Sequence, residues 1–202
     1  MTTRTQSQEG TVNVNGINIH YLERGDTRST PMGLLHGLRG HGHSWDDIAA
    51  AFSPDYHVLA LDQRGRGETD WASDGDYSTD AYVADLEGFC QAKGLDSFVL
   101  VGHSMGGRNS LLYASRHPET LQKLVVVDVG PEMDPKGSKR ITQEIIDVPE
   151  EFDSFEAVME YMGKQNRFAS DAVLRRRFEH ATKELPNGKI TWRYDLEIRE
   201  SR

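Results

Sequence analysis

The sequence predicts an α/β fold built around a mostly parallel sheet. Between residues 32 and 129, short apolar stretches typical of buried strands alternate with longer stretches of helical character. A Gly-x-Ser-x-Gly pentapeptide at 102–106 stands between one such strand and the next helix. Polar residues follow the strands, and ligands of open α/β sheets bind beyond the carboxyl ends of the strands. We therefore expect the functional site at that edge of the sheet.

The chain begins with a predicted β-hairpin. Residues 11–14 and 17–22 alternate between apolar and polar side chains. Asn15 and Gly16 join them, and this dipeptide favours the type I′ turn of a two-residue hairpin loop. A polar loop then leads to a short buried strand at residues 32–35.

Two helices are predicted before the pentapeptide. Ser44 is the expected N-cap of a helix over residues 45–52, because its hydroxyl can accept a hydrogen bond from a free N–H of the first turn. The second helix covers residues 78–93, and Gly94 is placed to end it in a left-handed conformation.

Three more stretches have the length and composition of strands, at residues 56–61, 98–101 and 124–129. A helix over residues 109–116 joins the last two. It ends before Pro118, since proline disfavours the helical conformation in the residue that precedes it. These elements complete the alternation of strands and helices.

The second part of the chain has a different character, with helices and no such alternation. Asp153 can cap one helix, and Ser170 can cap another that extends to Leu185. We therefore divide the chain into a core over residues 1–132 and a helical unit over residues 133–202.

The pentapeptide places Ser104 directly after a predicted strand and before a helix. In that context the serine is held on a sharp turn, with its hydroxyl above the carboxyl edge of the sheet. Gly102 and Gly106 stand where a Cβ atom would crowd the turn. The pattern indicates a nucleophilic serine, and the alternative is an ordinary serine in a glycine-rich turn.

Four segments in order resemble the α/β-hydrolase family. Besides the pentapeptide they are Leu-Leu-His-Gly-Leu at 34–38, Leu-Asp-Gln-Arg-Gly-Arg-Gly at 61–67 and Val-Val-Val-Asp at 125–128. The resemblance implies the α/β-hydrolase fold, a mostly parallel sheet preceded by an antiparallel hairpin. It also implies that residues 133–202 form a cap over the active site.

The resemblance further implies a serine hydrolase of the esterase or lipase kind, which cleaves a carboxylic ester, thioester or lactone through an acyl-enzyme on Ser104. The backbone N–H groups of Leu38 and Met105 are expected to form the oxyanion hole. Serine at this position argues against haloalkane dehalogenases and epoxide hydrolases, which carry aspartate there. The residues expected to support these groups are His36, Gly37, Gly102, His103 and Gly106.

The sequence does not supply a complete catalytic triad of serine, histidine and acid. Asp128 matches the place where a minority of the family carries the acid, but a structural carboxylate or an acid on the pocket floor is an equal alternative. His117 lies about 15–20 Å from Ser104 at 1.5 Å per helical residue, and His180 is expected to face solvent. The sequence therefore predicts a chain that ends before the seventh and eighth strands and is close to inactive by itself.

No metal or cofactor is predicted. His41 and His43 lack a thiolate or carboxylate pattern beside them, so exposed loop histidines are expected. Arg64 and Arg66 are interpreted as part of a solvated or internally bonded turn rather than a phosphate clamp. The function classes that stay open besides ester hydrolysis are cofactor-free C–C hydrolysis or perhydrolysis, and ligand binding with little or no turnover.

The amino-acid composition limits the kinds of molecule that the chain is expected to bind. The net charge of −9, from 23 basic and 32 acidic residues, argues against a nucleic-acid footprint. Cys90 is the only cysteine, which excludes an internal disulfide, and no apolar run has the length of a membrane span. We expect a cytoplasmic protein that acts on a small ester or acyl compound, with its oligomeric state left open.

Overall fold

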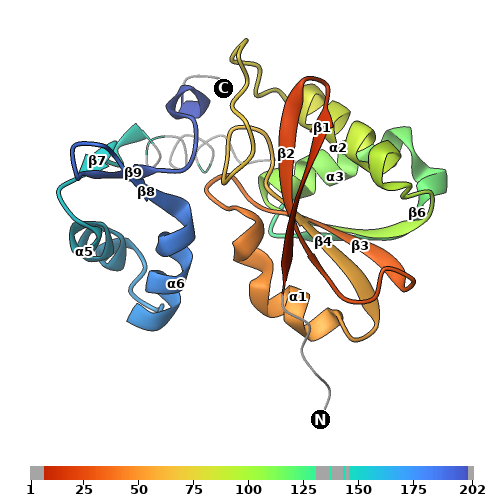
Figure 1. Ribbon diagram of the computed structural model, residues 1–202, viewed down its shortest axis with the longest axis horizontal. Helices are drawn as coiled ribbons and strands as arrows, with labels where there is room; N and C mark the ends of the chain where they lie inside the picture. The colour runs from red at the N-terminus through yellow and green to blue at the C-terminus, as the bar shows by residue number, and fades with distance from the viewer. Residues whose placement is uncertain (1–6, 131–136, 138–142, 144–145, 200–202) are drawn as a thin grey trace.

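The computed structural model describes residues 7–130, 137, 143 and 146–199. A six-stranded sheet with helices on both faces forms one unit, and a smaller unit of helices and short strands lies beside it (Figure 1). The strands of the large sheet, in the order β1-β2-β4-β3-β5-β6, are β1 (Gln8–Val14), β2 (Ile17–Arg24), β3 (Thr30–Leu35), β4 (Tyr56–Leu61), β5 (Phe98–His103) and β6 (Leu121–Val127).

The predicted sheet topology is confirmed. β1 pairs with β2 and β2 with β4 in antiparallel fashion, whereas the pairs β3–β4, β3–β5 and β5–β6 are parallel. Asn15 and Gly16 have φ angles of 53° and 81°, which are the positive values that a type I′ turn requires at both central residues. The hairpin prediction is therefore confirmed down to its turn.

Successive side chains of a strand point to opposite faces of the sheet, and helices bury both faces. Val58 and Ala60 of β4 belong to an apolar cluster that contains Ala49 of helix α1 (Asp46–Phe52). Leu59 and Leu61 belong to the other cluster, which is built with helices α2 (Thr79–Lys93) and α3 (Met105–Arg116). Thus α1 covers one face and α2 and α3 cover the other.

The observed ends of the helices agree only in part with the ends predicted from the sequence. Gly94 ends α2 with φ 65°, as predicted, and Ser78 is the N-cap rather than the first helical residue, its hydroxyl accepting a hydrogen bond from the Ala81 N–H (3.2 Å). The prediction for Ser44 is wrong, because a 3-10 turn, η1 (Gly42–Trp45), precedes α1. There the Ser44 hydroxyl accepts a hydrogen bond from the His41 N–H (3.2 Å) instead.

The predicted bounds of β6 and α3 also change. β6 begins at Leu121 and ends at Val127, and α3 begins at Met105, four residues earlier than expected. Within the described residues β6 pairs with β5 alone, so the side chains of Val125 and Val127 are 43% and 41% exposed at this edge. A short 3-10 turn, η2 (Pro118–Thr120), connects α3 to β6.

The smaller unit contains strands that the sequence analysis did not predict. Its sheet has the order β7-β9-β8, and its elements are β7 (Glu151–Phe152), α5 (Phe155–Gln165), α6 (Asp171–Ala181), β8 (Thr182–Glu184), β9 (Ile190–Trp192) and η3 (Leu196–Arg199). The cap of α5 is Ser154 rather than Asp153, and α6 ends before Leu185. The predicted boundary between residues 132 and 133 lies outside the described residues.

No helix in the described part of the chain is long and apolar enough to cross a membrane.

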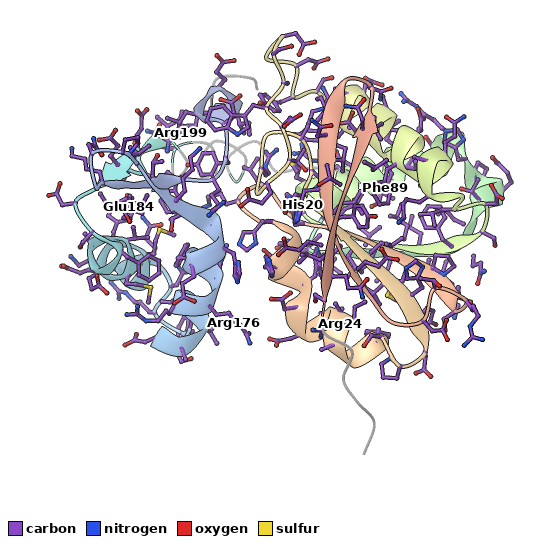
Figure 2. The ribbon with its side chains drawn as sticks, viewed as in Figure 1. His20, Arg24, Phe89, Arg176, Glu184 and Arg199 are labelled. Atoms are coloured by element: carbon purple, nitrogen blue, oxygen red, sulfur yellow. The ribbon has the colours of Figure 1, made fainter. Side chains whose placement is uncertain are left out.

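An apolar cluster joins the two units. Phe178 and Trp192 of the smaller unit share this cluster with Tyr77 and Met105, which belong to the larger one. The Tyr77 hydroxyl also donates a hydrogen bond to the Asp195 carboxylate (2.5 Å). The smaller unit is thereby held against the loops at the carboxyl ends of the strands, and Figure 2 shows the two units side by side.

A buried ion pair holds the loop after β4 against α2. The Arg64 guanidinium donates two hydrogen bonds to the Asp85 carboxylate (2.6 and 2.7 Å), and both side chains are less than a tenth exposed. A third bond reaches the carbonyl of Asp76 (2.8 Å). Arg64 is therefore part of an internally bonded turn, which was one of the two interpretations from sequence.

We predict that Arg64→Met destabilises the protein by about 3–5 kcal/mol, because it leaves the Asp85 carboxylate buried without a partner. The double variant Arg64→Met/Asp85→Leu should be more stable than Arg64→Met alone. Urea unfolding measures both effects. Arg28→Met removes an exposed pair with Asp26 and is the matched control, with no measurable change expected. An equal loss for Arg28→Met would contradict the burial argument.

Candidate active site

Ser104 occupies a strained backbone conformation between β5 and α3. Its φ and ψ angles are 51° and −114°, outside the regions that residues other than glycine ordinarily adopt. The Ser104 N–H donates to the Val127 carbonyl of β6 (2.9 Å), which fixes the turn against the neighbouring strand. Such strain costs on the order of 1–3 kcal/mol and persists only where the surroundings hold the backbone. The strand, serine and helix thus follow one another as the sequence predicts.

The glycines around Ser104 allow three segments to approach closely. A Cβ atom on Gly102 would lie 2.4 Å from the Gly106 carbonyl oxygen, and one on Gly106 would lie 2.3 Å from the Leu35 carbonyl oxygen. A Cβ atom on Gly37 would lie 2.7 Å from the His103 ring and 3.3 Å from the Ser104 Cβ. The loop after β3 therefore packs directly against the serine.

His36 orients the peptide group between Gly37 and Leu38. Its Nε2 accepts a hydrogen bond from the Gln63 N–H (3.0 Å), so the ring proton lies on Nδ1, which donates to the Gly37 carbonyl (2.8 Å). In a trans peptide the N–H points away from the carbonyl. The Leu38 N–H is therefore directed away from His36. Met105 opens α3, and the first N–H groups of a helix have no partner within it.

Buried polar side chains from the loop after β4 and from α3 hold this arrangement. The Gln63 amide donates to the His36 carbonyl (2.7 Å) and accepts from the Asn109 amide (2.7 Å), linking the loops after β3 and β4 to α3. The Arg66 guanidinium donates to the Leu38 carbonyl (2.7 Å). The sequence analysis gave Gln63 no role, because it stands at the x position of the Asp-x-Arg-Gly segment, where the pattern specifies no residue type.

Asp128 lies next to the pentapeptide but at the surface. It follows β6 with φ 56°, and its carboxylate lies 3.7 Å from Nε2 of His103. The Asp128 side chain is 84% exposed. The structure thus brings Asp128 to His103 rather than to Ser104 itself.

The prediction that His41 is an exposed loop histidine is wrong. His41 is 4% exposed, and its Nε2 is hydrogen bonded to the Arg177 carbonyl of α6 (3.2 Å). The rings of His43 and His180 stack with their centroids 3.7 Å apart. These contacts join residues more than 130 positions apart, which explains why local patterns missed them. His117 lies at the far end of α3, as predicted.

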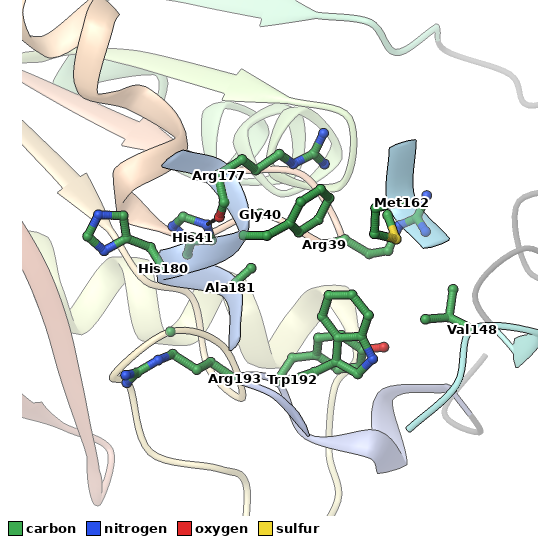
Figure 3. Close-up of a pocket in the computed structure, with 13 residues that line it drawn as sticks. Arg39, Gly40, His41, Val148, Met162, Arg177, His180, Ala181, Trp192 and Arg193 are labelled. Atoms are coloured by element: carbon green, nitrogen blue, oxygen red, sulfur yellow. Dashed lines mark hydrogen bonds between the residues drawn. The ribbon is translucent and has the colours of Figure 1, made fainter. Parts of the chain in front are cut away.

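A cavity of about 540 Å³ opens beside Ser104, between the two units. The loop after β3 forms one wall, and Val173, Arg176 and Arg177 of α6 form another. The Arg176 guanidinium reaches Asp47 of α1 with two hydrogen bonds (3.1 and 2.6 Å; Arg176 is labelled in Figure 2). A much smaller cavity of about 20 Å³ adjoins it and shares Arg39, Gly40 and Arg177 (Figure 3).

Burial keeps two site histidines neutral. Desolvation lowers the pKa of His36 to about 3, and the positive charge of Arg66 lowers it further than burial alone. Desolvation also lowers the pKa of His41 to about 4. Both imidazole rings are therefore neutral at neutral pH. His36 keeps the tautomer with its proton on Nδ1, which orients the Gly37–Leu38 peptide.

We predict that His36 makes the protein sensitive to acid. Because its pKa of about 3 lies below the usual value of 6.5, the unfolded state binds the proton first, and stability falls as pH drops below about 6.5. Between pH 7 and pH 5 the parent should lose about 2 kcal/mol more unfolding free energy than His36→Gln. Urea unfolding at the two pH values measures this. Equal losses in both proteins would show that His36 does not take up the proton on unfolding.

Comparison with known proteins agrees with the fold. A family profile described as alpha/beta hydrolase fold matches residues 30–159. The fold, the turn at Ser104 and this match define the class, and the chain belongs to the alpha/beta hydrolase fold family. An alpha/beta hydrolase from Novosphingobium aromaticivorans superposes with a TM-score of 0.86 at 26% identity, over 95% of this chain and 70% of that chain.

Curated relatives in this family carry different activities. N-formylmaleamate deformylase of Pseudomonas putida is 40% identical over 119 residues, which are 59% of this chain and 44% of that protein. Epoxide hydrolase 4 of Mus musculus is 36% identical over 114 residues, 56% of this chain and 32% of that protein. The chain thus spans less than half the length of these relatives.

Proposed function

We propose that this chain carries the nucleophile and the oxyanion-binding groups of a serine hydrolase that cleaves a carboxylic ester, thioester or lactone. The observation that carries the proposal is the strained backbone of Ser104, held between β5 and α3 at the wall of a cavity. Strain of this kind at a cavity is typical of functional residues. The name of the deformylase relative indicates removal of an N-formyl group, which is an acyl group. This supports acyl chemistry as the kind of reaction that the chain catalyses.

In the proposed reaction the Ser104 hydroxyl attacks the acyl carbon and forms an acyl-enzyme, which water then hydrolyses. The negative charge that develops on the acyl oxygen is stabilised by the N–H groups of Leu38 and Met105. The amino end of α3, directly behind Ser104, favours negative charge at the same place. His36 acts as a positioning residue, because its ring holds the Gly37–Leu38 peptide.

The attack also needs a general base for the serine proton. His36 cannot serve, because both of its ring nitrogens are engaged by the Gly37 carbonyl and the Gln63 N–H. The general base of the proposed reaction is therefore a group other than His36. Binding without turnover, the second function class from sequence, is a distinct outcome of the tests below.

Labelling with a fluorophosphonate and turnover of short p-nitrophenyl esters test the proposal. We expect labelling on Ser104, its loss in Ser104→Ala, and its retention in Ser115→Ala, which removes an exposed serine from the same helix. Saturable ligand binding with no labelling and no ester turnover would replace the hydrolase proposal with the binding one.

Asp128 is proposed as the acid that orients the base. In a hydrolytically active form of the protein, Asp128→Asn should lower kcat by about 10⁴, because the base then adopts the wrong tautomer. Ester kinetics at saturating substrate measure this. A loss smaller than about tenfold would assign the acid to another residue and leave Asp128 as a surface carboxylate beside His103.

A further inference from the structure

Three arginines line the cavity beside Ser104, and one of them is paired with a carboxylate. Arg176 is paired with Asp47 of α1 through two hydrogen bonds (3.1 and 2.6 Å). Arg39, in the loop after β3, and Arg177, on α6, have no carboxylate within 4.0 Å among the residues that the structure describes. Two arginines of the cavity wall therefore have no carboxylate partner in the described part of the chain.

Arg39 offers a donor that has no acceptor. Its Nη1 atom is buried and has no hydrogen-bond partner in the described part of the chain. A buried donor without a partner is unfavourable, since it has lost its hydrogen bonds to water. Arg39 also directly follows Leu38, whose N–H we propose as part of the oxyanion hole, so its position in the chain is tied to the reacting centre.

Arg177 supplies the second charge from the opposite wall. Its guanidinium lies over the Phe178 ring, 5.5 Å from the centroid, and its carbonyl accepts a hydrogen bond from the His41 ring. The side chain remains exposed, so a ligand can reach it. Surrounding protein atoms lower the pKa of Arg177, and the nearby charge of Arg39 lowers it further. Figure 3 shows both side chains, which arise from different elements.

We infer that Arg39 and Arg177 bind an anionic carboxylate of the substrate, so that the preferred substrates are half-esters or related acyl derivatives of small dicarboxylic acids. This inference rests on the proposed function of Ser104. Guanidinium groups match the two oxygens of a carboxylate with paired hydrogen bonds. The cavity volume of about 540 Å³ suits a small molecule that reaches both Ser104 and the two arginines. With a net charge of −9, the protein as a whole repels anions, so their binding needs a local positive site of this kind.

Binding to the 202-residue chain tests the anion site without any need for turnover. Isothermal titration should show that succinate binds and that uncharged succinamide does not, with succinate affinity falling as salt rises. Arg39→Gln and Arg177→Gln should each weaken succinate binding by about tenfold or more. Arg175→Gln removes the same charge from the same helix outside the cavity and is the matched control. Inorganic phosphate is titrated in parallel, and binding tighter than that of succinate would overturn the assignment to a carboxylate.

Kinetics on a hydrolytically active form of the protein separate this inference from the proposed function. The substrates are mono-p-nitrophenyl succinate and p-nitrophenyl 4-methylpentanoate, in which an uncharged isopropyl group replaces the carboxylate. We expect a higher kcat/KM for the succinate ester and a fall in this preference in both arginine variants. Equal kcat/KM values would overturn the anion site alone. Failure to hydrolyse either ester, with Ser104 unlabelled, would overturn the proposed function.

Several outcomes of the succinate titration would contradict the proposed carboxylate site. Equal affinities for succinate and succinamide, or no binding of succinate at all, would remove the carboxylate site. A loss in Arg175→Gln as large as that in Arg177→Gln would show that only the overall charge of α6 matters. Circular dichroism of each variant keeps a folding defect from being read as a binding defect.

Discussion

The close approach of β5, α3 and the loop after β3 is the constraint on which the site depends. Gly102 and Gly106 lack the Cβ atoms that would hold these segments apart, and Gly37 lets the loop lie against the serine. The backbone of Ser104 can then keep a conformation that would relax in isolation. Packing at three glycines thus stabilises the geometry of one residue.

A second layer of polar contacts fixes the direction of the peptide groups. His36, Gln63 and Asn109 connect the ends of two strands to one helix through buried hydrogen bonds. Because each side chain has its partners, the network is satisfied without a charge at its centre, and desolvation keeps the His36 ring neutral. The carbonyl of Leu38 is held separately by Arg66. The candidate oxyanion groups therefore lie on a rigid support.

The parts of the structure that depend on nearby residues could be predicted from the sequence. The turn at Asn15-Gly16, the end of α2 at Gly94 and the strand before Ser104 follow from residue types within a few positions. The strands of the smaller unit have only two or three residues, too few for an alternating pattern to distinguish them from loops. The environment of His41 depends on Arg177, which is 136 positions away, so no local pattern could reveal it.

The three tryptophans lie in three different surroundings, and this gives the molecule built-in optical probes. Trp192 is enclosed in the apolar cluster of the smaller unit, Trp45 lines the cavity beside Ser104, and Trp71 is 47% exposed near the Lys183 ammonium group. Indole emission shifts to longer wavelength as water gains access to the ring. Proteins that retain a single tryptophan would therefore report separately on the interior of the smaller unit, on the occupancy of the cavity and on the solvent-facing surface.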